Sequence, residues 1–113
     1  MGDKLFIGKP NNGLLRRGVL EFDLSTVPEF AHITGVTLDL SVIEIPANAQ
    51  NGSATLHLAL AEWGESTSTG NGNGGPSQIG DTTWVHTFFD TVNWNSAGGD
   101  YSPQLQPSAL SPI

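Results

Sequence analysis

Short runs of alternating apolar and polar residues, bounded by glycine, proline or asparagine, constrain this chain more than any other sequence feature. The clearest run lies within residues 33–45, where Val36, Leu38, Leu40 and Val42 alternate with other side chains. Successive side chains of a strand point to opposite faces, so the pattern predicts a β-strand with one buried face. Fourteen glycines and seven prolines disfavour long helices. We therefore expect an all-β protein.

Further strands are expected on both sides of this run. Lys4 to Ile7 is a short apolar segment, and the Gly-Lys-Pro-Asn-Asn-Gly sequence of residues 8–13 predicts a hairpin-like return into Leu14 to Leu24. Thr55 to Ala61 alternates again, which places its leucines inward and its histidine on the opposite face. Residues 66–80 form a long polar loop, a type of segment that is usually functional or mobile.

The chemically densest part of the chain is Asp81 to Asp100, which contains two of the three tryptophans. In an extended strand Trp84, His86 and Phe88 would share one face, and we expect Trp84 to fill the core. Polar side chains and a Gly-Gly-Asp turn follow this aromatic segment. The stretch thus predicts a strand that runs into a functional or structural corner.

Length and charge limit the function classes. A chain of 113 residues fits one domain, which we expect over residues 1–102, with a proline-rich tail over 103–113. The formal net charge of −7 would repel a phosphate backbone, so nucleic-acid binding is not expected. There are no cysteines, which excludes disulfides, and no apolar run approaches the roughly 20 residues of a membrane span.

Several short motifs occur in an order that resembles the disaggregatase-related (DNRLRE) domain family. The first is an arginine-led strand that ends in Phe-Asp, followed by a proline loop and a Thr-x-Leu strand. The motifs that carry the resemblance are Leu15 to Leu24, Ile33 to Leu38, Leu56-His57, Trp63-Gly64-Glu65, Gly80 to His86 and Gly98 to Tyr101. Together they cover roughly Leu5 to Ser102, which is nearly the whole chain.

The resemblance implies an extracellular, jelly-roll-like antiparallel β-sandwich, and some relatives of this kind are carbohydrate-binding modules. The N-terminal residues show no signal-peptide pattern. Members of the family usually continue for several more strands after the Gly-Gly-Asp segment. A sandwich without those strands would have an unpaired edge, and a homodimer or strand exchange would cover it.

The leading functional hypothesis is a polysaccharide-binding or surface-adhesion module that is not catalytic. Trp63 and Trp94 lie beside polar loops, where flat rings can stack on sugars while Glu65 and Asn93 bond hydroxyl groups. The alternative for these tryptophans is a place in the core.

The second hypothesis is a small metal-dependent or hydrolytic enzyme that acts on polysaccharide. Its general base would be His86, oriented by Asp81 or Asp90, with His57 nearby. Neutral imidazoles also bind zinc or copper, although no metal-binding histidine motif is present. The alternative is that these histidines are hydrogen-bonded beneath loops.

A structural Ca²⁺ ion is a further expectation. Asp90, Asn95 and Asp100 supply the hard oxygen ligands that calcium prefers, but their spacing does not match an EF-hand loop.

Overall fold

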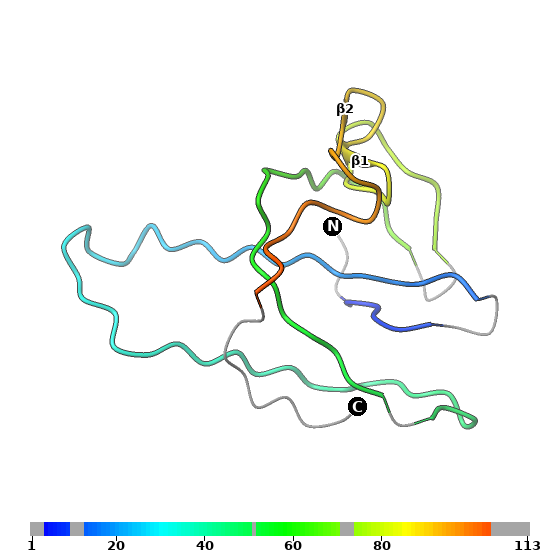
Figure 1. The fold of residues 1–113 in the computed structure, drawn as a ribbon, viewed down its shortest axis with the longest axis horizontal. Helices are drawn as coiled ribbons and strands as arrows, with labels where there is room; N and C mark the ends of the chain where they lie inside the picture. Colours follow the sequence, from blue (N-terminus) through cyan, green and yellow to red (C-terminus); the bar gives the residue numbers. More distant parts are fainter. Residues whose placement is uncertain (1–3, 10–12, 51, 71–73, 105–113) are drawn as a thin grey trace.

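The computed structural model describes residues 4–9, 13–50, 52–70 and 74–104. Within these residues it has no helix and two short strands, β1 (His86–Phe88) and β2 (Val92–Asn93). The strands are antiparallel, in the register His86 to Asn93 and Phe88 to Val92. The remaining described chain follows extended or turning paths, and the hairpin lies at one edge of the molecule (Figure 1). Two stacked sheets are not formed by the described residues, so the β-sandwich stays a prediction.

The hairpin forms because its turn residues satisfy an unusual backbone conformation. Asp90 has a φ of 64°, in the left-handed region that aspartate tolerates better than most residues. The backbone N–H and the hydroxyl of Thr91 both donate to the carbonyl of Phe88, at 3.0 and 3.1 Å. The Thr87 hydroxyl donates to the carbonyl of Val92 across the strands. Local polar groups therefore close the turn, and β-branched and aromatic residues extend it.

Two other places bring distant backbone segments together. Gly8 and Arg16 form an antiparallel pair with two hydrogen bonds, which confirms the predicted return of the first segment. Residues 58–60 pair with residues 100–102 through hydrogen bonds of 2.9 Å from Leu60 to Asp100 and from Ser102 to Leu58. The expectation that the leucines of this segment lie inward is wrong, since all of them are exposed.

The small core lies beside the hairpin. Trp94 is its buried apolar residue, and Asp81 and Thr87 are buried with it. The Trp94 indole Nε1 donates to the carbonyl of Thr83 at 2.9 Å. Trp84, which the alternating pattern assigned to the core, is instead 43% exposed. The core tryptophan is therefore the one that follows β2.

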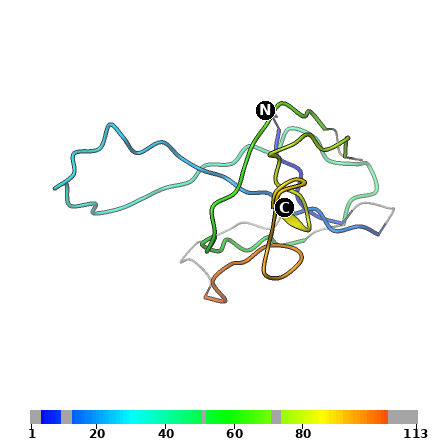
Figure 2. The same ribbon diagram turned by 90° about the horizontal axis from the view of Figure 1, so that it is seen from above.

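Residues 19–50, here called the arm, form an open loop whose turning end projects beyond the rest of the molecule in both views (Figures 1 and 2). Hydrogen bonds within the arm are local, as between Val27 and Leu24 or Ala49 and Pro46. The strand expected over residues 33–45 finds no partner among the described residues, and most of its apolar side chains are exposed. An alternating pattern fixes which face a strand would bury, but burial needs a second layer that the described chain does not supply.

The described residues contain no helix of the length and hydropathy that crossing a membrane requires.

Candidate functional site

The segment that leads into β1 folds as a tight turn. The hydroxyl of Thr83 accepts the backbone N–H groups of Val85 and His86, at 3.2 and 2.9 Å. The Thr83 N–H donates in turn to the carbonyl of His86 at 2.9 Å. This local bonding competes with an extended conformation, which explains why the alternating pattern fails here. The turn displaces Trp84 outward onto the molecular surface.

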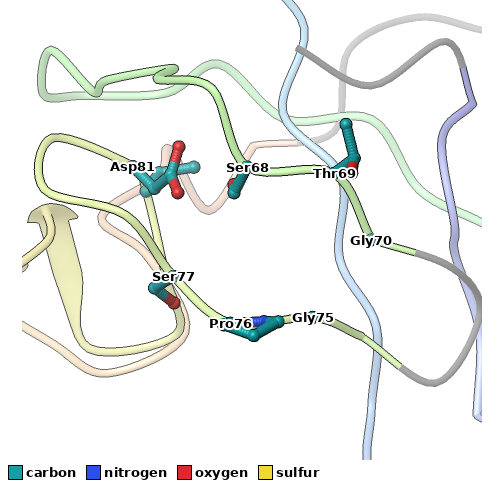
Figure 3. A pocket seen from close by; sticks show the side chains of 8 residues that line it. Ser68, Thr69, Gly70, Gly75, Pro76, Ser77 and Asp81 are labelled. Carbon is teal, nitrogen blue, oxygen red and sulfur yellow. The ribbon is translucent and has the colours of Figure 1, made fainter.

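Asp81 fixes the polar loop that precedes it. Its carboxylate accepts the N–H of Ser66 at 2.8 Å and that of Gln78 at 2.7 Å, and Ser68 provides a side-chain hydrogen bond (Figure 3). Burial raises the pKa of Asp81, but the hydrogen bonds from Ser68, Gln78 and Ser66 outweigh this effect. The net result is a pKa below the usual range for aspartate. The carboxylate is thus charged and engaged in holding the loop.

A small cavity of about 140 Å³ lies beside Asp81, between the two sides of the same loop (Figure 3). Hydroxyl groups and glycine backbone dominate its lining, with Ser68, Thr69 and Ser77 among the residues that form it. It has room for little more than a few water molecules.

The Trp63-Gly64-Glu65 motif packs against the hairpin through its central glycine. The Gly64 N–H donates to the carbonyl of Thr87, and the Gly64 carbonyl accepts the N–H of Thr82. A side chain at Gly64 would collide with the carbonyl of Gly80 and the ring of Phe88. Trp63 is half-buried and Glu65 is exposed on either side of this contact. The motif therefore has a clear structural role.

Four planar groups from distant parts of the chain form a continuous row on the surface. The Arg17 guanidinium lies 4.9 Å from the ring centre of Trp84 and 5.4 Å from that of Tyr101. The ring of His57 lies 4.9 Å from that of Tyr101, tilted by 59°. Trp84 and Tyr101 are each 43% exposed. We call Trp84, Arg17, Tyr101 and His57 the planar row.

Side-chain hydrogen bonds hold two members of the row, Arg17 and His57, in place. Arg17 Nη1 donates to the carbonyl of Gly98 at 2.9 Å. Gly98 has a φ of +92°, and a Cβ there would lie 2.8 Å from Arg17 Nη1. His57 Nδ1 donates to the carbonyl of Ser102 at 2.7 Å, and His57 Nε2 lies 3.1 Å from the hydroxyl of Thr55. These contacts preorganise the rings before any ligand arrives.

An open groove of about 510 Å³ runs beside the planar row. Arg17 and Tyr101 form part of its wall, and residues 95–100 form much of the rest. The carboxylate of Asp100 accepts the N–H groups of Asn95 and Ser96, each at 2.9 Å, which shapes this loop. The groove thus combines one flat ring, that of Tyr101, with a cation and polar groups that can bond hydroxyls.

No family model, curated protein or solved structure matches the chain. The site must therefore be interpreted from its own residues.

The residues proposed for catalysis are not brought together. His86 lies 3.0 Å from the Thr83 hydroxyl through Nδ1 and packs edge-on against Phe89, whereas Asp81 holds the polar loop. His57 belongs to the planar row. None of the hydrogen bonds and ring contacts of the described residues joins any two of His57, Asp81 and His86.

The residues proposed for calcium are also used elsewhere. Asp90 occupies the hairpin turn, and both carboxylate oxygens of Asp100 accept backbone N–H groups, one of them from Asn95. Within the described ranges, no group of three or more histidine, aspartate or glutamate side chains is arranged to hold a metal ion. The donor set therefore does not fit a calcium site in this arrangement.

The residues proposed for ligand binding divide between the core and the surface. Trp94 is 8% exposed, which leaves its ring faces covered. Asn93 is exposed on β2, and Glu65 is exposed beside Gly64. The sequence reasoning did not assign Arg17, Trp84 or Tyr101 to the site. The sequence offered one signal for Arg17: it belongs to an adjacent pair of arginines in a chain with only four basic residues.

Proposed function

We propose that this protein is a carbohydrate-binding or surface-adhesion module that holds a polysaccharide along the planar row without cleaving it. The observation that carries the proposal is the pair of exposed rings, Trp84 and Tyr101, that both contact one guanidinium, with Tyr101 and that guanidinium lining an open groove. Flat aromatic faces suit the apolar faces of sugar rings. Polar groups of the 95–100 loop and Arg17 supply partners for hydroxyl groups.

The resemblance to the DNRLRE family supports the same function. It implies an extracellular location and a jelly-roll-like sandwich, and we include both in the proposal. The exposed apolar side chains of the arm are consistent with strands that become paired in the assembled protein.

Self-association forms part of the proposal. The arm exposes a run of large apolar side chains, among them Val36, Val42 and Ile43. Apolar side chains left exposed on an extended backbone are typical of a surface that a second subunit covers. A homodimer would remove such a surface from water.

Removal of the Trp84 ring is expected to weaken glycan binding. Purified protein would be mixed with a panel of insoluble polysaccharides, and the fraction left in solution measured. We expect at least one polysaccharide to deplete the wild type, with Trp84→Ala weakening the affinity about 30-fold, equivalent to about 2 kcal/mol. Tyr101→Ala should act in the same direction because its ring contacts the same Arg17 and lines the groove.

The matched control is Phe30→Ala. Phe30 is 96% exposed and lies in the arm, so its removal deletes an exposed ring outside the planar row. Equal losses in Phe30→Ala and Trp84→Ala would contradict a specific site. Release of soluble sugar, with sensitivity to His86→Ala, would support the hydrolytic enzyme instead. A parallel series with chelator tests for calcium, since loss of binding on chelation would require a bound cation.

A further inference from the structure

Residues 33–45 read almost the same in both directions around Asp39. The sequence is Ile-Thr-Gly-Val-Thr-Leu-Asp-Leu-Ser-Val-Ile-Glu-Ile. Paired antiparallel with a second copy centred on Asp39, Val36 faces Val42 and Leu38 faces Leu40. On the other face of the strand, Thr37 faces Ser41 and Ile33 faces Ile45. A twofold interface requires this kind of self-complementarity, because each copy contributes the same surface.

The structure leaves this segment available for pairing. Within the described part of the chain, the backbone of residues 33–45 takes part in no hydrogen bond. Val36 is 85% exposed, and Leu40 and Val42 are each at least half exposed. In Figure 1 the segment forms the lower limb of the arm, away from the hairpin. An extended segment with unused N–H and C=O groups and an apolar face is a template for strand addition.

We propose that residues 33–45 pair with the same residues of a second copy as an antiparallel strand, with the twofold axis at Asp39. The pairing forms a continuous sheet across the dimer and places Val36, Leu38, Leu40 and Val42 of both copies on one apolar face. This inference deepens the proposed self-association by naming its segment and register. It is independent of glycan binding by the planar row.

The register carries one repulsive pair, which gives a direct test of it. Near the centre, apolar residues face apolar residues and uncharged polar residues face uncharged polar residues. The exception is Asp39, which faces its own copy. Like charges directly opposite one another weaken an antiparallel pair. The substitution Asp39→Asn should therefore tighten the dimer, by a factor on the order of 1.5 to 5.

Cysteine cross-linking tests the register directly, because the chain contains no cysteine of its own. Residues directly opposite in an antiparallel pair have Cα atoms about 4.5–5.5 Å apart, which a disulfide can span. Asp39→Cys places two thiols at this separation. Ser41→Cys lies on the same strand face, but faces Thr37 and would be roughly 13 Å from its own copy.

We expect mild oxidation to convert Asp39→Cys to a covalent dimer at least ten times faster than Ser41→Cys, measured by non-reducing electrophoresis of the full chain. Light scattering after size exclusion should show a dimer of the unmodified protein. A monomer would overturn both the self-association and the segment. A dimer with equal cross-linking of both variants, or with none, would overturn only the proposed pairing of residues 33–45.

Discussion

Trp94→Ala is expected to lower the free energy of unfolding by about 3–5 kcal/mol, the range for truncation of a large buried aromatic residue. Trp94 is the buried apolar side chain of the described core, so the cavity left behind has few neighbours that could fill it. The indole hydrogen bond to the Thr83 carbonyl would be lost as well. Single domains have total stabilities of about 5–15 kcal/mol, and the variant would lose much of that.

Urea unfolding followed by circular dichroism measures this loss, at one fixed protein concentration because self-association also contributes to stability. Trp94→Phe is the matched variant: it keeps an aromatic ring but removes the Nε1 donor, and should cost less than Trp94→Ala. Trp84→Ala removes the same side chain from an exposed position and should change stability by less than about 1 kcal/mol. Equal losses for Trp84→Ala and Trp94→Ala would contradict the assignment of the core.

The contrast between these two tryptophans shows what the sequence could predict of the fold. Proline, asparagine and glycine between Gly8 and Arg16 favour a chain reversal, and the predicted return was confirmed by the pairing of these two residues. The alternation through Trp84 described a strand only if the backbone stayed extended. The Thr83 hydroxyl instead bonds two N–H groups and turns the chain. A hydrophobic pattern does not predict a local side-chain hydrogen bond of this kind.

The arm illustrates a different limit. Alternation in residues 33–45 identifies the face that a strand would bury, but cannot say whether the covering layer comes from the same chain. The leucines of residues 56–60 show the same limit, because their backbone is partly paired while their side chains remain exposed. In both segments the periodicity did not predict the burial of the apolar side chains.

The candidate site depended on contacts between residues far apart in the chain. Arg17 stacks on Trp84 and donates to Gly98, which lies 81 positions away. No local spacing rule connects these residues. Aromatic residues beside polar loops were expected to bind ligand, and that physical argument still applies. It applies to Trp84 and Tyr101, because the fold exposes their rings and buries Trp94.

Asp81→Asn is expected to destabilise the protein by about 2–3 kcal/mol at neutral pH, the cost of leaving a buried N–H donor without its charged acceptor. The carboxylate accepts N–H groups from Ser66 and Gln78, and an amide can accept at only one of its two terminal atoms. The polar loop over residues 66–80 should then exchange its amide hydrogens faster. Asp90→Asn is the matched control, because Asp90 is exposed and asparagine also tolerates a positive φ.

The difference between wild type and Asp81→Asn should depend on pH in a defined direction. Hydrogen bonds lower the folded-state pKa of Asp81, whereas an unfolded aspartate titrates near about 3.9. Above that pH the charged carboxylate stabilises the folded state fully, and the contribution disappears as the pH falls through the lower, folded-state pKa. Urea midpoints at pH 7, 5 and 3 measure the difference, which should be constant between pH 7 and 5 and smaller at pH 3. A difference that grew on acidification would mean that Asp81 is held in its protonated form, which would contradict its role as a charged acceptor for the loop.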